Sequence, residues 1–128
     1  MIEITAIQKY SKRTTASLKL QAQRLFNAYI RNRDEGEGCI SCGSTNEIQA
    51  GHYHSAGQNN HLRFDEDNVN GQCKKCNYFV SGSLAKYRHN LIEKIGKERV
   101  EKLDRMAGDR GVHKTDRFFL IEIIEKYK

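Results

Sequence analysis

Two Cys-x-x-Cys pairs constrain this sequence more than any other feature. They are Cys39 with Cys42 and Cys73 with Cys76, and 30 residues separate the pairs. In a reducing compartment such pairs are more often metal ligands than disulfides, because thiol-reducing systems keep intracellular cysteines reduced. Four thiolates fill a tetrahedral zinc site and leave no position for water, so the ion stabilises the fold and does no chemistry. The pattern therefore predicts a structural zinc site.

The length and composition indicate one folded domain. The chain has 128 residues, of which 30% are charged and 38% hydrophobic, which suits a single polar globular domain. No segment resembles a signal peptide or approaches the roughly 20 apolar residues of a membrane span, so we expect a cytoplasmic protein. We divide the expected domain into a basic N-terminal arm and helix, a zinc-bound core and C-terminal helices, over residues 1–34, 35–95 and 96–128.

Apolar residues at spacings of three and four predict helices at both ends of the chain. We expect a helix from Thr14 or Thr15 to Arg33, one from a Ser83 cap to Gly96, and others over 97–108 and from about 115. Two short strands are expected near 48–53 and 68–73, joined by an irregular polar loop over 55–67. The expected fold class is α+β and mainly helical.

Positive charge is concentrated in the first 33 residues. The chain has a net charge of +6, and residues 1–33 alone contain seven basic residues and one acid, whereas the remainder is balanced. This distribution is typical of proteins that bind a polyanion, because each phosphate contact releases condensed counterions. A solvated helix face accounts for the same charges equally well.

The segment between and around the cysteines contains His52, Asn68 and Asn77 in this order, with nine residues from Asn68 to Asn77. This set resembles the HNH, or ββα-metal, nuclease motif, in which a histidine ends one strand, an asparagine opens the next and a His or Asn at a helix start holds a divalent metal. The Cys-x-x-Cys-Asn ending is also similar to that of phage endonuclease VII, a Holliday-junction resolvase. The resemblance implies a zinc-stapled ββα-metal core flanked by helices.

Longer segments resemble the phage NinG (Rap) recombination protein family. They are YIRNRDEGEGCISCGS, QAGHYHSAG, LRFDEDNVNGQCKKCNYFVSGSLAKYR and LIEKIGKERVEKL. The resemblance implies a metal-dependent endonuclease that cleaves branched DNA, such as D-loops and Holliday junctions, in the cytoplasm of a bacterial host. Because junction cleavage needs matched cuts on two strands, we also expect a homodimer formed through the terminal helices, and recombination proteins as further partners.

The chemistry of phosphodiester hydrolysis assigns roles to these residues. It needs a base for the attacking water and positive charge near the phosphate. His52 is the expected base, since imidazole titrates near neutrality, and Asn68 is expected to fix the loop that orients it. Asn77 is the expected ligand of a catalytic Mg²⁺ or Mn²⁺, which prefers oxygen donors. No acid occurs in residues 68–92, and the expected DNA contacts are Arg63, Lys74, Lys75, Lys86 and Arg88.

Gly51 departs from the HNH pattern, which often has an acidic or histidine metal ligand directly before the base. The metal would then rest on Asn77 and phosphate oxygens, or it would recruit His54, Asp65 or Asp67. Among these, His54 is the candidate that shares a strand face with the base if the strand continues. His61 ranks below His54 as a candidate, and His89 and His113 are expected to be structural or solvated.

A non-catalytic zinc-containing nucleic-acid-binding module is the alternative interpretation. In it, His52 and Asn77 only hydrogen-bond the loop, and a single histidine or an asparagine-rich run taken alone favours such a structural role. A third interpretation is an interaction protein whose C-terminal helices recruit a recombination partner. The spacing of His52, Asn68 and Asn77 favours the endonuclease, because a binding module has no need of it.

Overall fold

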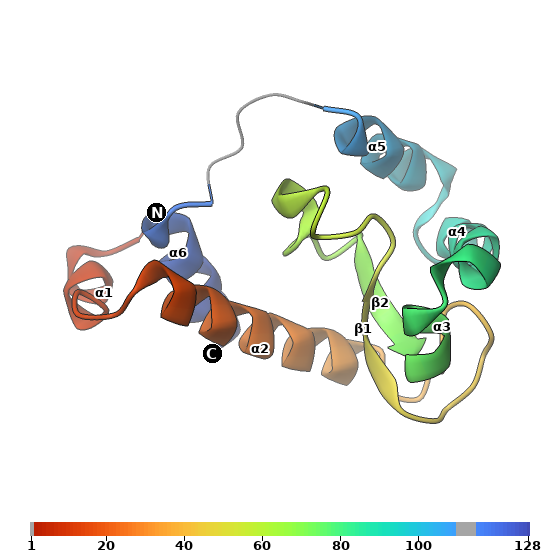
Figure 1. Cartoon of the computed structure of the whole chain (residues 1–128), viewed down its shortest axis with the longest axis horizontal. Coiled ribbons are helices and arrows are strands. Elements are labelled where there is room, and N and C mark those ends of the chain that lie inside the picture. Colours follow the sequence, from red (N-terminus) through yellow and green to blue (C-terminus); the bar gives the residue numbers. More distant parts are fainter. Residues whose placement is uncertain (1, 110–114) are drawn as a thin grey trace.

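The computed structural model describes residues 2–109 and 115–128, so that His113 lies outside the described residues. The elements follow one another along the chain as α1 (Ile4–Lys9), α2 (Thr15–Arg33), β1 (Ile48–His52), the 3₁₀ turn η1 (Asn60–Leu62), β2 (Val69–Cys73), α3 (Lys74–Tyr78), α4 (Val80–Ile95), α5 (Lys97–Ala107) and α6 (Arg117–Tyr127) (Figure 1). The expected mainly helical α+β class is confirmed.

A two-stranded antiparallel hairpin lies between the helices (Figure 1). In its register, Gln49 lies opposite Gln72, Gly51 opposite Asn70 and His52 opposite Val69. Because side chains alternate along a strand, Gln49 and Gly51 belong to one face of β1 and His52 to the other. An isolated hairpin is only marginally stable in water, so this one depends on the layers packed against its two faces.

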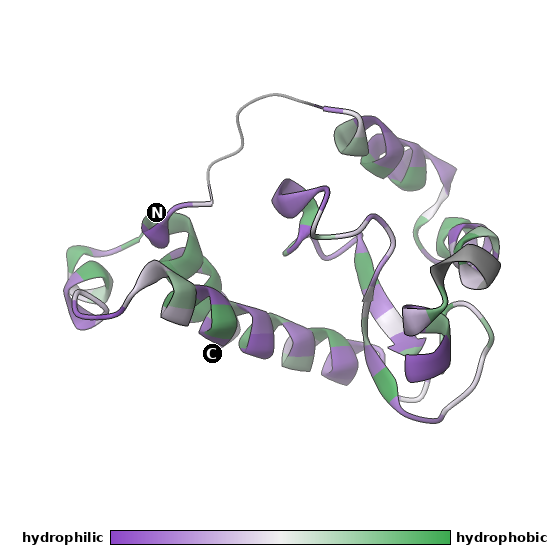
Figure 2. Cartoon of the chain, viewed as in Figure 1, coloured by the Kyte–Doolittle hydropathy of each residue, from purple (hydrophilic) through white to green (hydrophobic). Residues whose placement is uncertain are grey.

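The first hydrophobic core joins one face of the hairpin to α1, α2 and α6. It contains Phe26 and Ile30 from α2, Ile121 and Ile124 from α6, and Val69 from β2, all without solvent exposure or nearly so. Figure 2 shows α6 as predominantly hydrophobic. α2 begins where predicted, because the Thr14 side chain accepts a 3.1 Å hydrogen bond from the backbone N–H of Ser17.

The second hydrophobic core packs α4 and α5 against the other face of the hairpin. Tyr87 and Leu91 of α4 meet Val100 and Leu103 of α5, together with Tyr53 and Leu62 from the loop region. The Tyr87 hydroxyl donates a 2.7 Å hydrogen bond to the Gly51 carbonyl and so ties α4 to β1. Gly96 separates α4 from α5 with a φ of 93°, which only glycine adopts without strain.

The N-terminal residues are packed on the molecule instead of forming a free arm. α1, which was not predicted, lies against α6, and Ala6 and Tyr10 are buried in the first core. The Tyr10 hydroxyl donates a 2.7 Å hydrogen bond to Glu125, and Arg117 donates to the Tyr10 carbonyl. These contacts hold residues 4–10 against α6, whereas the sequence pattern predicted a basic arm there.

Two helix starts differ from the prediction, by four residues for α4 and by two for α6. α4 begins at Val80, and Ser83 lies inside it, where its hydroxyl donates to the carbonyls of Cys76 and Phe79 at 2.9 and 3.2 Å. A serine that bonds backward in this way continues a helix instead of capping it. α6 begins at Arg117, because Asp116 is the residue whose side chain accepts from the Phe119 N–H. None of the helices described over 2–109 and 115–128 is long and apolar enough to cross a membrane.

Candidate metal centre and active site

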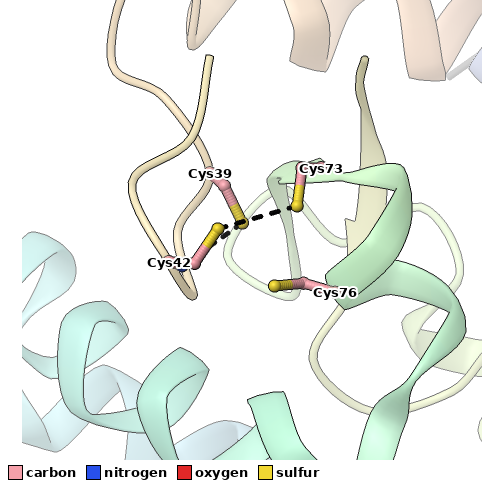
Figure 3. A group of neighbouring side chains, drawn as sticks. All are labelled: Cys39, Cys42, Cys73 and Cys76. Atoms are coloured by element: carbon pink, nitrogen blue, oxygen red, sulfur yellow. Dashed lines mark hydrogen bonds between the residues drawn. The ribbon is translucent and has the colours of Figure 1, made fainter. Parts of the chain in front are cut away.

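The four cysteines converge from two separate parts of the chain. Cys39 and Cys42 lie in the loop between α2 and β1, Cys73 ends β2, and Cys76 lies in α3, with their side chains turned toward one another (Figure 3). All four sulfur atoms lie within 4.8 Å of one another, and the Cys42 and Cys73 Sγ atoms are 3.7 Å apart. A tetrahedral zinc with bonds of about 2.3 Å places its sulfurs about 3.8 Å apart. The cluster can therefore hold a structural zinc, as predicted.

Backbone N–H groups already favour a thiolate at the first cysteine. Burial raises the pKa of the Cys39 thiol, but hydrogen bonds from the backbone outweigh it and bring the pKa down to about 7. Two of these donors are the N–H groups of Ser41 and Cys42, at 3.3 and 3.4 Å from Cys39 Sγ. Metal binding requires the deprotonated thiol, so this loop is arranged to receive a cation.

His52, the predicted base, ends β1 and is held by the loop that follows. Its Nε2 lies 3.0 Å from the Arg63 carbonyl oxygen. Because a carbonyl can only accept, Nε2 must carry the proton, and the neutral ring keeps its lone pair on Nδ1. Burial and the nearby positive charge of Arg63 lower the pKa of His52 although the carbonyl contact opposes them. The ring is therefore neutral at pH 7, in a single tautomer.

The Nδ1 atom of His52, which carries the lone pair, is not fully buried. Nδ1 makes no hydrogen bond to any residue that the structure describes. Among these residues, no buried side-chain nitrogen or oxygen lacks a partner, so Nδ1 cannot be buried. A neutral imidazole with an accessible lone pair can take a proton from water.

Arg63 places an uncompensated positive charge beside this histidine. Its Nε donates to the Asn60 side chain and its Nη1 to that of Gln23, each at 2.9 Å. Both partners are neutral amides, and burial lowers the pKa of the Arg63 guanidinium. A half-buried arginine without a carboxylate partner favours an anion, and its contact to phosphate stays a prediction.

Asn68 is fully buried and crosslinks the two segments around His52. Its amide nitrogen donates to the carbonyls of His54 and Leu62 at 3.0 and 3.1 Å, and its oxygen accepts from the His54 N–H at 2.9 Å. Leu62 directly precedes the residue whose carbonyl holds the His52 ring. These contacts agree with the predicted role of Asn68 in fixing the loop that orients the base.

Asn77 lies near the other end of β1. Its Nδ2 donates a 2.9 Å hydrogen bond to Gln49 Oε1, and its Oδ1 makes no hydrogen bond with the described residues. Gln49 and His52 are three residues apart, or about 10 Å along an extended strand, and lie on opposite faces of it. The structure therefore brings together His52, Arg63 and Asn68, whereas Asn77 lies in α3, which packs on both strands, and its side chain contacts Gln49 near the far end of β1.

The space beside Gly51 is filled by Gln72. A Cβ atom at position 51 would lie 2.2 Å from Gln72 Oε1 and 2.7 Å from Gln72 Cβ. The Gln72 amide nitrogen donates to the Ser41 hydroxyl at 3.0 Å, and the residue is buried. An acidic residue at position 51 would therefore require Gln72 to move, which is a physical reason for the glycine.

His54 belongs to a separate group of polar residues around Asp104 of α5. Its Nε2 donates to Asp104 Oδ1 at 2.9 Å, the Tyr53 hydroxyl donates to the same oxygen at 2.7 Å, and Arg88 donates to Oδ2 at 3.0 Å. Burial alone would raise the pKa of Asp104, but these donors lower it. Arg88, predicted to contact DNA, thus has a carboxylate partner within the protein. Asp104 is a part of this region that sequence reasoning missed.

Some of the other side chains predicted to contact metal or DNA are bonded within the protein, and others are exposed to solvent. Asp67 forms a salt bridge with Arg99, and Asp65 Oδ1 accepts the Asp67 N–H at 2.9 Å. Among the described residues, the four cysteines are the only group of three or more His, Cys, Asp or Glu side chains arranged to hold a metal. Exposed side chains remain at Lys74, Lys75 and Lys86.

Comparison with known proteins identifies the family. The model of the family described as Bacteriophage Lambda NinG protein matches residues 4–128. Protein ninG of Escherichia phage 933W is 46% identical over 86 residues, which cover 66% of this chain and 43% of that protein. Protein ninG of Escherichia phage lambda is 45% identical and protein ninG of Salmonella phage P22 is 46% identical, each over 86 residues. Each match covers 66% of this chain and 42% of the relative.

The matched part of this chain thus corresponds to less than half the length of these curated relatives. No solved structure matches the chain. Because the family model covers nearly every residue, the chain belongs to the bacteriophage lambda NinG family.

Proposed function

We propose that this protein is a metal-dependent endonuclease that cleaves branched DNA, such as D-loops and Holliday junctions. One observation carries the proposal: the Arg63 carbonyl holds His52 as a neutral ring whose Nδ1 is not fully buried, beside a guanidinium that has no acidic partner among the described residues. A base and an adjacent cation are the two requirements of phosphodiester hydrolysis. A purely structural histidine has no need of the second group.

His52 Nδ1 takes the proton of the attacking water in this mechanism, while the Arg63 carbonyl stabilises the ring through Nε2–H. Arg63 binds the phosphate and offsets the negative charge that develops on it. Asn68 keeps the two segments in register, so that the ring and the guanidinium approach the same phosphate. Lys74, Lys75 and Lys86 bind flanking phosphates.

Asn77 would hold the catalytic Mg²⁺ or Mn²⁺ through Oδ1, the oxygen that makes no hydrogen bond with described residues. Such an ion supplies Lewis-acid stabilisation of the leaving oxygen when bound. Asp65 and Asp67 are engaged within the protein, so the remaining ligands of such an ion would be phosphate oxygens and water. His54, paired with Asp104, is the less suited recruit.

Substitution of His52 and of Asn77 tests the chemistry. His52→Ala and Asn77→Ala should each retain zinc and bind a four-way junction nearly as well as the parent, yet lose metal-dependent nicking by about two or more orders of magnitude. His89→Ala is the matched control, since the His89 side chain is 75% exposed on α4, and it should cut normally. Robust cutting by His52→Ala would refute the mechanism.

His52 should set the pH dependence of cleavage, and Asn77 should set its dependence on the Mg²⁺ concentration. Because burial lowers the pKa of His52 below its ordinary value of 6.5, cleavage should be constant at neutral pH and fall only as the pH drops through this lowered pKa. Asn77→Ala should instead raise the Mg²⁺ concentration that is needed for half-maximal nicking. Distinct phenotypes are expected because the two residues lie at different ends of β1.

A non-catalytic zinc module remains the alternative function, favoured by the fact that both His52 and Asn77 already have partners in the protein. It predicts that added Mg²⁺ or Mn²⁺ produces no nicking in any variant.

The endonuclease proposal has two further parts. The protein acts as a homodimer in the cytoplasm of the infected cell, and it meets other recombination proteins there. Sedimentation of the parent with and without a junction tests the homodimer.

A further inference from the structure

Two adjacent aromatic side chains project from the surface next to the cysteine cluster. Tyr78 ends α3 and Phe79 connects it to α4, and their exposed fractions are 66% and 69%. Neither residue belongs to either hydrophobic core. A large aromatic ring contributes strongly to stability when buried, so this exposure has no explanation in the fold. We call Tyr78, Phe79, Lys74, Lys75 and Lys86 the aromatic–lysine surface.

The lysines of this surface surround the two rings. Lys74 Nζ lies 5.9 Å from the centre of the Tyr78 ring. Phe79 lines a hollow of about 280 Å³ together with Lys75, Lys86 and residues of the cysteine cluster. All three lysine side chains are exposed, and no salt bridge among the described residues involves them. The nearest acids in the sequence are Asp67 and Glu93, and the Lys74 N–H donates a 3.0 Å hydrogen bond to the Glu47 carbonyl.

We infer that the aromatic–lysine surface recognises the unstacked bases of a DNA branch point, with Tyr78 and Phe79 stacking on the bases and the lysines contacting the neighbouring phosphates. This inference rests on the proposed action on branched DNA and assigns the residues that select the branch. Base faces are covered in a continuous duplex and exposed where strands diverge. Stacking on an aromatic side chain tolerates any base, because every base has a π-face.

The division of labour within the surface follows from chemistry. Lysine–phosphate contacts form with duplex and branched DNA alike, so they add affinity without preference. The rings gain a partner only where a base is unstacked, so they add preference for the branch. A protein partner is the less fitting occupant, because a surface with three unpaired lysines around its apolar centre would bury positive charges without counterions.

The preference for branched over linear DNA tests this assignment. Affinities for a four-way junction and for a linear duplex of the same sequence are measured without added Mg²⁺ or Mn²⁺, so that cleavage does not contribute. Tyr78→Ala and Phe79→Ala should each lower the junction-to-duplex affinity ratio by about fivefold or more, and Phe79→Trp should preserve it. Lys75→Gln should weaken binding of both DNAs equally and reduce the salt dependence by about one counterion.

Phe118→Ala is the matched control, because this phenylalanine is 48% exposed on α6, far from the cysteine cluster in the sequence. It should leave the affinity ratio unchanged. A 2-aminopurine base at the branch point reports stacking directly: its fluorescence should be quenched by the parent and less so by Phe79→Ala. An unchanged ratio in both alanine variants would overturn the inference, as would a change in sedimentation that shows the rings to join two copies of the chain.

The outcome separates this inference from the proposed catalysis. If the parent prefers junctions through Phe79 but nicks nothing with metal, the endonuclease proposal fails and the branch-recognition surface stands. If metal-dependent nicking depends on His52 while Phe79→Ala keeps the parent's preference for junctions, the branch-recognition surface fails and the endonuclease proposal stands.

Discussion

Replacing Asp34 by asparagine should strongly destabilise the protein, because the Asp34 carboxylate is buried and joins several elements. The Asp34 side chain is 2% exposed and accepts four hydrogen bonds: two from Arg33 at 2.8 and 2.9 Å, one from Lys94 at 2.9 Å and one from the Gly71 N–H at 2.8 Å. It thereby joins the end of α2 to β2 and α4. Asparagine has nearly the same shape but no charge and only one acceptor oxygen.

The expected loss follows from what remains after the substitution. Removing one partner of a buried ion pair costs about 3–5 kcal/mol, because the other charges stay behind uncompensated. The Arg33 and Lys94 side chains keep 26% and 28% exposure, so water relieves part of the cost and the lower value of about 3 kcal/mol applies. For a domain of this size, that loss lowers the Tm by about 10 °C.

Urea unfolding of the zinc-bound proteins at several pH values measures this free energy. Burial alone would raise the pKa of Asp34, but its donors lower it well below the ordinary value of 3.8. A carboxylate whose pKa is depressed by folding stabilises the protein above its unfolded pKa and loses this contribution as the pH falls. The gap between parent and Asp34→Asn should thus be constant from pH 7 to about 5 and narrow below about 4.

Glu35→Gln is the matched control, since Glu35 is the next acid in the chain and is exposed. It should change the free energy of unfolding by less than about 0.5 kcal/mol. A loss below about 1 kcal/mol for Asp34→Asn, or a gap that widens in acid, would refute the ion-pair reasoning.

Further predictions concern the zinc, the glycine and the basic surface. Cys73→Ser should release zinc and lower helical circular dichroism, because binding free energy at a structural site is folding free energy; unchanged zinc content by atomic absorption would contradict this. Gly51→Asp should destabilise the protein by about 1–3 kcal/mol through overpacking against Gln72, and adding Gln72→Ala should recover most of this loss in the same urea titration. Lys12, Arg24 and Arg31 are exposed, and their joint change to glutamine should make the salt dependence of DNA affinity shallower; an identical slope would show that these three side chains do not contact DNA.

Local signals predicted the longer helices, because their causes lie within a few residues. The Thr14 cap and the φ of Gly96 set helix ends at the positions that the sequence indicates. α1 and α3 escaped prediction because they have six and five residues, too few for an apolar period and too few to form alone. Contacts with α6 and with the hairpin hold them, and such contacts have no local pattern.

The cysteine cluster was predictable from the sequence, whereas the hydrogen-bond partners of His52 and His54 were not. The Cys-x-x-Cys spacing indicated the cysteine cluster, since a metal imposes it. The carbonyl that holds His52 belongs to Arg63, 11 residues later, and the carboxylate that holds His54 belongs to Asp104, 50 residues later. The sequence contains several acids that could accept a hydrogen bond from His54. Asp104 is the one that does so because α5 packs in the second core. The same packing gives Arg88, a predicted DNA contact, a carboxylate partner within the protein.

The Asp104 contacts decide where a working fragment of this protein can end. Residues 35–95 contain the cysteines, His52, Asn68 and Asn77, yet a polypeptide cut after Ile95 would leave Tyr53, His54 and Arg88 without their shared acceptor. At the other end, removal of α2 would take away Gln23, the partner of Arg63. The smallest unit that keeps these contacts accordingly extends from α2 to α5, so that residues 35–95 transplanted into another protein would keep the partners of His54 and Arg63 only with helices from both sides.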